Sequence, residues 1–401
     1  MATVTSLMWR SLNTFSRGFA LLPPCPMEWD ISKNRFIPYT NPKSLFFWKV
    51  LMLCLFLSNI VYVILFLAAI LGTATMTLVE VMISCLFLSI GVFANLVEIV
   101  IFMHVGNTAQ AFNCVAILEK QIIEFPTSCS TSQKAGKIDM VGLVLNSITF
   151  VFVIHTIIVP ICGIYIGLDP YSLFVARVVP LHWQTVPKYG IIPLKIILIG
   201  SWYLVARVLA MTMCSCTLAA YLTLSCIASL CAKSGLIETY QISPYLVEYS
   251  SCELILSIAY PFLAPAVALC LLNGFVLSIL YNFISLKMHH MIPMPFFAVF
   301  PTLAVASITI IQTMVPIAIS IHTDTTELRD IWKRFVASSQ NKRHVVRQIR
   351  AKRSIRVYVG VADHNFFIFC KSLLPTYYEA TVYYTITALM SIDTSGVQIT
   401  L

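Results

Sequence analysis

The most restrictive feature of the sequence is a series of apolar runs that recurs from residue 46 to near the end of the chain. Each run is long enough for an α-helix to cross a bilayer, which takes about 20 residues. Hydrophobic residues make up 59% of the chain and charged residues 11%, against roughly 45–50% and 25% in soluble domains. Because peptide groups in lipid must be bonded within the chain, the runs are expected to be helices. The sequence therefore predicts an all-α, polytopic membrane protein.

Seven transmembrane helices are predicted, separated by segments rich in polar residues, glycine or proline. The predicted spans are Phe46–Leu71, Met76–Met103, Val141–Gly167, Ile191–Ala232, Leu254–Leu286, Met294–Ile321 and Val361–Ile392. The fourth span is predicted to be one long helix that overruns the bilayer at about 1.5 Å per residue. The apolar residues are spread from end to end, which predicts one membrane domain. Its parts are an N-terminal tail (1–45), a six-helix bundle (46–321), a basic helical segment (322–360), and a seventh helix with a short tail (361–401).

The distribution of lysine and arginine predicts the orientation. If the N-terminus is cytoplasmic, the inner segments hold nineteen of these residues and the outer segments hold three. Because positively charged loops stay on the cytoplasmic side, the N-terminus is expected inside and the C-terminus outside. This orientation is opposite to that of a G-protein-coupled receptor, and the Asp-Arg-Tyr and Asn-Pro-x-x-Tyr motifs of those receptors are absent from the corresponding spans.

The basic segment before the last span carries ten of these cations, from Arg329 to Arg356. Leu328, Ile331 and Phe335 recur in it at helical spacing with charges between them, which predicts an amphipathic helix or helix pair. Its charged face is explained by solvation, by anionic lipid of the inner leaflet, or by contact with partner subunits. The membrane setting makes nucleic acid an unsuitable partner.

The last span carries an unusual number of polar residues. Its segment from Pro375 to Ser391 contains a carboxylate, four tyrosines and four threonines. At about 100° per residue, five polar side chains fall within an arc of roughly 120°; they are Thr376, Glu379, Tyr383, Thr387 and Ser391. Polar groups are costly in lipid, so this edge predicts contact with water or with other polar groups. One interpretation is hydrogen bonding between helices of one chain, and the other is a pore in which Glu379 favours cations.

Three further features concern known sequence patterns. The N-terminal tail leads through Pro24, Trp29 and Asp30 to the first span, and Leu328 and Trp332 form an L-x-x-x-W pattern before the basic helix. In the last span, Thr376-Tyr377 is followed by five residues and then by Tyr383-Tyr384.

With these features, a length of 401 residues and an inverted seven-helix topology, the chain resembles the arthropod gustatory receptors of the insect-type gustatory and odorant chemoreceptor superfamily. The family has Thr-Tyr and, five residues later, Gln-Phe. Tyr383-Tyr384 stands in place of Gln-Phe, which marks the chain as a divergent member.

The resemblance implies a chemosensory receptor of the plasma membrane that acts as a ligand-gated, non-selective cation channel. A small organic tastant or odorant would open it, and membrane lipid and permeating cations would be its other partners. Four copies, or a mixture with related subunits, would assemble with their seventh helices around the pore. The implied pore and gate residues are Thr376, Tyr377, Glu379, Tyr383, Tyr384, Thr387 and Ser391. The alternatives are a G-protein-coupled receptor and, less favoured for lack of internal repeats, a small-molecule transporter.

The resemblance also places a ligand pocket in the outer membrane half of each subunit. Aromatic and histidine residues in the outer halves of the spans are the candidates, although core packing explains each of them as well. They are Phe87, His155, Tyr165, Trp202, Tyr203, Tyr281, Phe296, Phe297 and Phe300. Arg207 is the deepest cation, and Glu80 or Glu98 is expected to pair with it. No catalytic motif, cofactor motif or metal-ligand spacing is present, so we expect a non-enzyme without a cofactor or metal.

Overall fold

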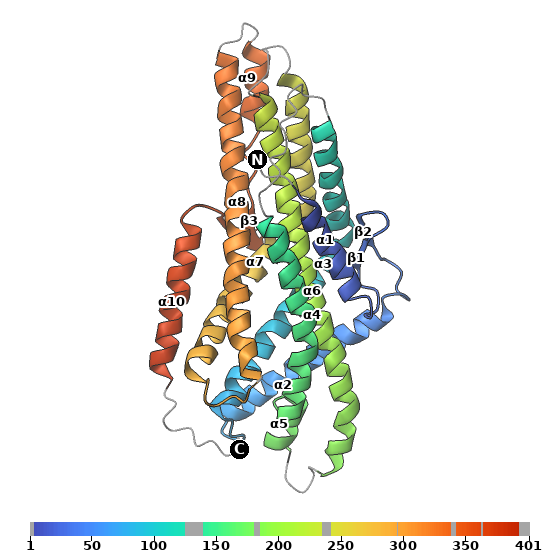
Figure 1. Cartoon of the computed structure of the whole chain (residues 1–401), viewed down its shortest axis with the longest axis vertical. Helices are drawn as coiled ribbons and strands as arrows, with labels where there is room; N and C mark the ends of the chain where they lie inside the picture. The colour runs from blue at the N-terminus through green and yellow to red at the C-terminus, as the bar shows by residue number, and fades with distance from the viewer. Residues whose placement is uncertain are drawn as a thin grey trace.

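The computed structural model describes residues 4–124, 139–179, 185–234, 242–294, 296–337, 342–361 and 364–392. They form an elongated bundle in which α9 and α5 lie at opposite ends, called here the α9 end and the α5 end (Figure 1). The helices are α1 (Ser6–Gly18), α2 (Phe46–Ile70), α3 (Leu78–Glu124), α4 (Met140–Ile166), α5 (Pro170–Arg177), α6 (Thr185–Ser234), α7 (Ile242–Lys287), α8 (Val299–Ala337, after the 3₁₀ turn Phe296–Ala298), α9 (Lys342–Ala351) and α10 (Leu373–Ser391). Two hairpins pair β1 (Met27–Asp30) with β2 (Arg35–Pro38) and β3 (Tyr358–Val361) with β4 (His364–Ile368).

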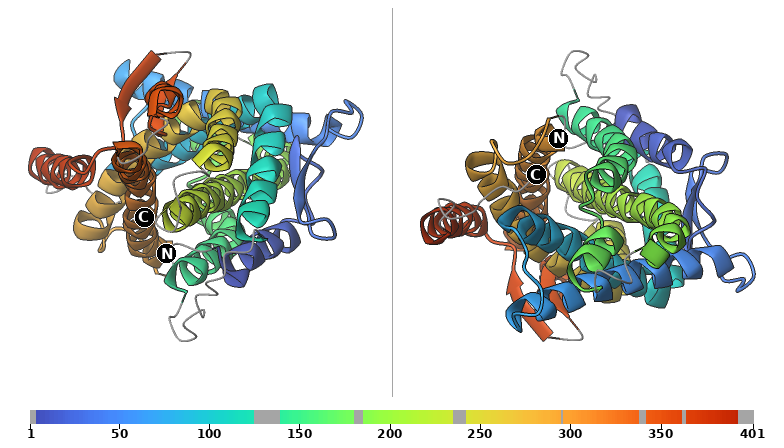
Figure 2. Two further views of the ribbon diagram at one scale, coloured as in Figure 1. Left: turned by 90° about the horizontal axis from the view of Figure 1, so that it is seen from above. Right: turned by 90° about the horizontal axis from the view of Figure 1, so that it is seen from below.

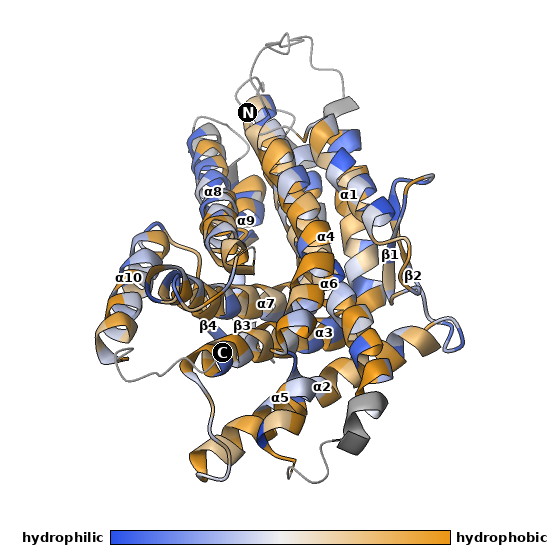
Figure 3. Cartoon of the chain, turned by 60° about the horizontal axis from the view of Figure 1, so that its bottom comes forward, coloured by the Kyte–Doolittle hydropathy of each residue, from blue (hydrophilic) through white to orange (hydrophobic). Residues whose placement is uncertain are grey.

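The long helices confirm the predicted class, an all-α polytopic membrane protein. Six candidate spans in the described chain are long and apolar enough to cross a bilayer, namely α2, α3, α4 with α5, α6, α7 and α8. The helix α6 is continuous over 50 residues, so the fourth span is one helix, as predicted. At 1.5 Å per residue it is about 75 Å long, against about 30 Å for the hydrocarbon core. Hydrophilic residues gather on α8 near α9 (Figure 3).

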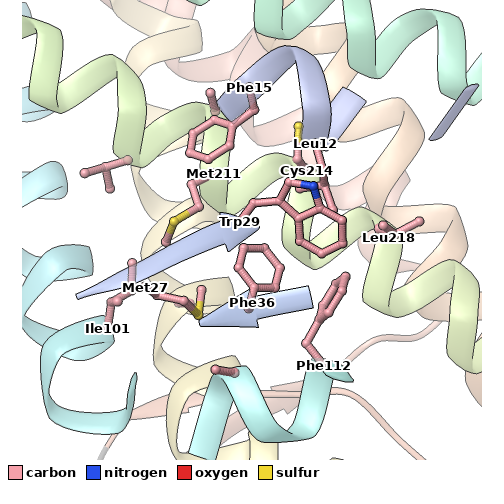
Figure 4. Close-up of a cluster of buried hydrophobic side chains, with 14 of the residues drawn as sticks. Leu12, Phe15, Met27, Trp29, Phe36, Ile101, Phe112, Met211, Cys214 and Leu218 are labelled. Carbon is pink, nitrogen blue, oxygen red and sulfur yellow. The ribbon is translucent and has the colours of Figure 1, made fainter. Parts of the chain in front are cut away.

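The N-terminal residues are packed into the bundle. Trp29 of β1 and Phe36 of β2 are paired across the hairpin, and the Phe36 ring lies 4.7 Å from that of Phe112 in α3 (Figure 4). The turn passes through Asn34, whose φ of 47° is a conformation that asparagine tolerates. Asn113 of α3 accepts from the Phe36 N–H and donates to its carbonyl, both at 2.9 Å. The Asn113 side chain therefore pairs with the backbone of β2 in the way that a neighbouring strand would.

The buried arginine also holds the N-terminal segment. Arg207 is 3% exposed, and its Nη1 donates to the Pro23 carbonyl at 2.7 Å. Glu80 pairs with Arg177 at 2.7 Å instead, while Glu98 is buried and interacts with Arg207 electrostatically. Of the two carboxylates expected to pair with Arg207, Glu98 is therefore the one that interacts with it, whereas Glu80 pairs with Arg177 of α5.

The L-x-x-x-W pattern forms a packing centre at the α9 end. Leu328 and Trp332 lie one helical turn apart on α8 and are fully buried. The indole Nε1 of Trp332 donates to Ser234 Oγ of α6 at 2.8 Å, and its ring meets Tyr249 of α7 edge to face at 5.4 Å. One side chain thus joins three long helices.

The last helix begins later than predicted. The expected start at Val361 is wrong, because Val361 ends β3 and α10 begins at Leu373. At Gly360 a Cβ would lie 2.2 Å from the His364 carbonyl oxygen, so only glycine permits this close approach of the two strands. Pro375 lies in the first turn of α10, where a missing N–H costs nothing.

We predict that Trp332→Ala lowers the free energy of unfolding by about 3–5 kcal/mol, since it removes a fully buried indole and leaves a cavity. Trp332→Phe keeps a smaller aromatic ring and leaves the buried Ser234 hydroxyl without its donor, so it should cost less, about 1–3 kcal/mol. The measurement is an unfolding titration of the purified protein with a denaturing detergent. Equal losses for the two variants would contradict the packing role of the indole.

Candidate ligand cavity and pore helix

The helix α10 stands at the edge of the bundle and has α7 as its main neighbour. Both end views show it outside the ring formed by the other long helices (Figure 2). It has 19 residues, or about 28 Å, which matches the hydrocarbon core. It is absent from the six apolar candidates because its tyrosines, threonines and Glu379 lower its hydropathy.

The predicted polar edge of α10 faces away from the bundle. All five of its residues, from Thr376 to Ser391, are exposed, and Tyr383 reaches 64%. The Thr387 hydroxyl donates to the carbonyl four residues earlier at 2.9 Å, and those of Thr376 and Ser391 bond in the same way. The donor of each hydroxyl is therefore satisfied in lipid, and its oxygen can still accept a hydrogen bond from water.

The opposite edge of α10 contains the threonines that the helix buries. Thr381 and Thr385 are each 6% exposed, and each hydroxyl donates to a carbonyl of its own helix, at 2.8 and 2.7 Å. The helix therefore buries some of its polar residues within the chain, while Glu379 and Tyr383 lie on the exposed edge.

Aromatic packing fixes α10 to α7. The Phe275 ring lies 5.8 Å from both the Tyr377 ring and the Tyr384 ring. A Cβ at Gly274 would stand 3.3 Å from the Tyr377 hydroxyl oxygen, so glycine lets the tyrosine lie against the α7 backbone. Of the predicted gate pair, Tyr384 thus touches α7, while Tyr383 points away from it.

A lysine holds the other end of α10. The Lys287 ammonium at the end of α7 donates to the Leu389 carbonyl at 2.7 Å and to the Ile392 carbonyl. These carbonyls belong to the last turn of α10, where the helix offers no N–H partners and its dipole favours a cation. The two helices are therefore joined at both ends of their contact.

A cavity of about 230 Å³ lies among α3, α6, α7 and α8. Of the nine residues predicted to bind ligand, Tyr281 lines it and the other eight do not. Sequence analysis missed the polar residues of its wall, which include Thr212, Asn273 and Ser307. Their only signal was a small or polar side chain within an apolar run, and the sequence has many of these.

Most of the other predicted ligand residues serve packing or hydrogen bonding between helices. Phe87 meets Trp202 edge to face at 4.8 Å, and Phe296 meets Phe300 at 5.3 Å. Phe297 packs against the same cluster of buried side chains. The remaining three lie apart: Tyr203 donates to the Gly18 carbonyl, His155 Nε2 lies 3.2 Å from Thr302 Oγ1, and Tyr165 is 90% exposed.

The helix α7 forms a wall of the cavity and also the support of α10. Asn273, Gly274 and Tyr281 line the cavity, while Phe275 and Lys287 contact α10. A molecule in the cavity would therefore touch the helix that positions α10.

No protein-family model and no curated protein matches the sequence. Two solved structures of the insect olfactory receptor OR5 from Machilis hrabei do match, each at 10% identity. The complex with eugenol superposes with a TM-score of 0.61 over 96% of this chain and 97% of that one. The other structure gives 0.65 over 95% and 96%.

The chain has the fold of the insect olfactory receptors. The likeness covers almost the whole of both chains, so it includes α10 and the N-terminal elements as well as the six apolar candidates. At 10% identity the likeness shows a shared fold, and this is the fold that the sequence patterns led us to expect.

We predict that Gly274→Ala lowers the free energy of unfolding by about 1–3 kcal/mol, because the new methyl group overpacks against Tyr377. Tyr377→Phe removes the hydroxyl that the new methyl group meets, so the double variant should recover at least about 0.5 kcal/mol beyond additivity. The measurement is a double-mutant cycle of unfolding free energies. Gly106→Ala is the control, because open space surrounds that position, and additive effects at 274 and 377 would contradict the contact.

Proposed function

We propose that the protein is a chemosensory receptor that acts as a ligand-gated, non-selective cation channel opened by a small organic molecule. The observation that carries the proposal is the exposed polar edge of α10, a helix of membrane-spanning length that carries Glu379 and Tyr383 away from its own bundle. The fold shared with insect olfactory receptors supports a receptor of this type.

One α10 helix cannot enclose a pore, so the proposal includes assembly. Four copies, or a mixture with related subunits, place their α10 helices around a common axis with the polar edges inward. Glu379 then forms a ring of carboxylates that favours cations. Tyr383 and Tyr384 form the gate, one turn further along the helix.

The α7 helix provides the proposed coupling between ligand and gate. A ligand in the cavity presses on the face that carries Asn273 and Tyr281, and the opposite side of that helix bears the Phe275 ring against Tyr377 and Tyr384. Movement of α7 shifts both ends of α10 because Lys287 joins their last turns. Opening then requires a ligand that binds the displaced arrangement of α7 more tightly.

The proposed topology places the α9 end in the cytoplasm and the α5 end outside the plasma membrane. With α10 added to the six apolar candidates, the chain crosses seven times, and the N-terminus and C-terminus lie on opposite sides. The bias of lysine and arginine toward one side supports this orientation.

We predict that Cys370 reacts with a membrane-impermeant maleimide from the cytoplasmic side only. This exposed thiol lies just before α10, and hydrogen bonding to Ser372 lowers its pKa, which favours the reactive thiolate. Labelling is compared in intact and permeabilised cells. Cys370→Ser is the control that identifies the labelled residue, and equal labelling of this site in intact cells would contradict the topology and favour a receptor of opposite orientation.

We predict that Glu379→Gln lowers unitary cation conductance by up to roughly fivefold. A carboxylate about 4 Å from a cation in water contributes about 1 kcal/mol, which corresponds to a factor of about five in cation occupancy. The measurement is current recording in cells that express the chain alone, against a panel of tastants and odorants. Glu327→Gln changes an exposed carboxylate of α8 outside the proposed pore and is the matched control. Identical conductance and selectivity in the two variants would contradict the pore assignment.

A further inference from the structure

A groove between α1 and α4 contains two arginines that take no part in the cavity or in α10. It encloses about 550 Å³ and is lined on α1 by Arg10, Asn13, Thr14 and Arg17 and on α4 by Phe150 and Val153. Both arginines are exposed. Because they are seven residues apart on α1, they share one face of the helix at a separation of about 10 Å along its axis. Their two guanidinium groups can therefore meet one anion between them.

No carboxylate neutralises the two arginines within the described chain. None of the described salt bridges includes either of them, and no acidic residue is among those that line the groove. Asp139, at the start of α4, accepts from the Thr5 hydroxyl and from the Gly142 N–H. Residues 125–138, which precede α4 in the sequence, include two lysines and no acidic residue. The groove therefore offers two positive charges to an occupant from outside the chain.

Asn13 adds an uncharged donor to the groove. Its amide oxygen accepts from the indole Nε1 of Trp29 at 2.9 Å, so the NH₂ group of the same amide remains as a donor. Guanidinium groups form strong, charge-assisted hydrogen bonds with phosphate and carboxylate oxygens. The donors of the groove therefore suit an anion that has several oxygens, such as a phosphate group.

The groove lies at the height of one boundary of the hydrocarbon core. The part of α4 from Asn146 to Ile166 is about 30 Å long at 1.5 Å per residue, which is the thickness of that core. Asn146 donates to the Leu7 carbonyl at 3.0 Å and accepts from the Thr14 hydroxyl at 3.2 Å. The helix α1 therefore lies against the end of this span that faces the α9 end, which is the cytoplasmic side in the proposed topology.

An apolar stripe of α4 continues from the groove along the span. Leu143, Phe150 and Ile157 recur every seven residues, so they share one face of the helix, and they are 49, 61 and 53% exposed. A Cβ at Gly18 would lie 2.8 Å from Val153 Cγ2, so α1 packs closely against α4 beside this stripe. The groove thus joins a cationic site to an apolar surface that acyl chains can cover.

The position of α1 in the bundle leaves the groove open to lipid in the proposed tetramer. Both end views place α1 and α10 on different sides of the bundle (Figure 2). In the proposed tetramer α10 faces the common axis, so α1 faces away from that axis. The groove is therefore directed toward the surrounding bilayer.

We propose that the groove binds an anionic phospholipid of the inner leaflet, with its phosphate group between Arg10 and Arg17 and one acyl chain along Phe150 and Val153. The cytoplasmic leaflet carries anionic phospholipids. Arginine suits such a site because its planar group binds phosphate through two hydrogen bonds and keeps its charge. The binding of this lipid does not require that the chain conduct ions.

The lipid is expected to stabilise the N-terminal part of the fold. Asn13 joins α1 to β1 through Trp29, and the Tyr203 hydroxyl of α6 donates to the Gly18 carbonyl at the end of α1. A ligand that binds only the folded chain raises its stability by mass action. The protein should therefore melt at a higher temperature in nanodiscs that contain phosphatidylserine than in nanodiscs of phosphatidylcholine alone, and equal melting temperatures would contradict the proposal.

The first test measures lipid binding to the purified full-length protein in detergent by native mass spectrometry. Dioleoyl phosphatidylserine is compared with dioleoyl phosphatidylcholine, which has the same chains but no net charge. Each arginine close to a negative lipid surface contributes a factor of roughly five in affinity. The two arginines therefore predict a preference for phosphatidylserine of up to roughly 25-fold. Equal affinity for the two lipids would overturn the proposal.

The second test locates the site. The double variant Arg10→Gln, Arg17→Gln should lose the preference for phosphatidylserine and should melt at the same temperature in both kinds of nanodisc. Its matched control is Arg343→Gln, Arg347→Gln, which removes the same charge from exposed positions of α9. The control should keep the preference, because α9 lies at the far end of the bundle (Figure 1). Equal loss in the two double variants, or full preference in the first, would refute the site.

A third variant separates the charge of the groove from its fold. Arg10→Lys, Arg17→Lys keeps both positive charges, so it should retain most of the preference for phosphatidylserine. The melting temperature in phosphatidylcholine should equal that of the wild type for all three double variants, because the described chain contains no ion pair of Arg10 or Arg17. Loss of the preference in the lysine variant as well would contradict recognition by charge.

The last test separates a lipid from a soluble phosphate compound. Glycerophosphoserine has the head group of phosphatidylserine without its acyl chains, and inorganic phosphate is smaller still. Both should bind at least tenfold more weakly than the lipid, because they cannot cover the apolar stripe. Phe150→Ala should weaken the binding of both lipids severalfold, since it removes part of that stripe. Glycerophosphoserine that binds as tightly as phosphatidylserine would assign the groove to a soluble phosphate and overturn the proposed lipid site.

Discussion

The requirement that peptide groups in a bilayer be bonded within the chain governs this structure. It accounts for the helical form of the six apolar candidates. The hydroxyls on α10 follow the same principle, because they donate to carbonyls four residues earlier in the helix. The Lys287 ammonium meets the same requirement at the end of α10, where the last carbonyls lack N–H partners. The threonine and serine hydroxyls of α10 are compatible with a membrane because each donates to a carbonyl of the same helix.

The α7 helix connects the cavity with α10. Its Gly274 lines the cavity and also accommodates the Tyr377 hydroxyl of α10. Since close-packed interiors transmit small displacements, the absence of a side chain at this position makes α7 a thin wall between the cavity and α10. In the proposed channel, this wall replaces any direct contact between the ligand and the gate.

The N-terminal hairpin lines the cavity next to α3. Phe36 lies in the cavity wall, and Asn113 holds its backbone through two hydrogen bonds. Arg207 holds the preceding segment at Pro23. Residues that the sequence places in a tail before the first span thus line the cavity, and the buried arginine binds the backbone of that tail in addition to interacting with Glu98.

The sequence by itself determined the class of protein, the six apolar helices and the polar edge of α10, because length, hydropathy and helical periodicity are properties of consecutive residues. It also singled out Trp332, whose spacing from Leu328 is local. The cavity depended on the tertiary structure, since its wall joins residues as distant as Phe36 and Ile321. The hairpin at Gly360 depended on a contact between strands. Of the aromatic residues in the outer spans only Tyr281 lines the cavity, because packing between helices buries aromatic side chains in the same way as a pocket would.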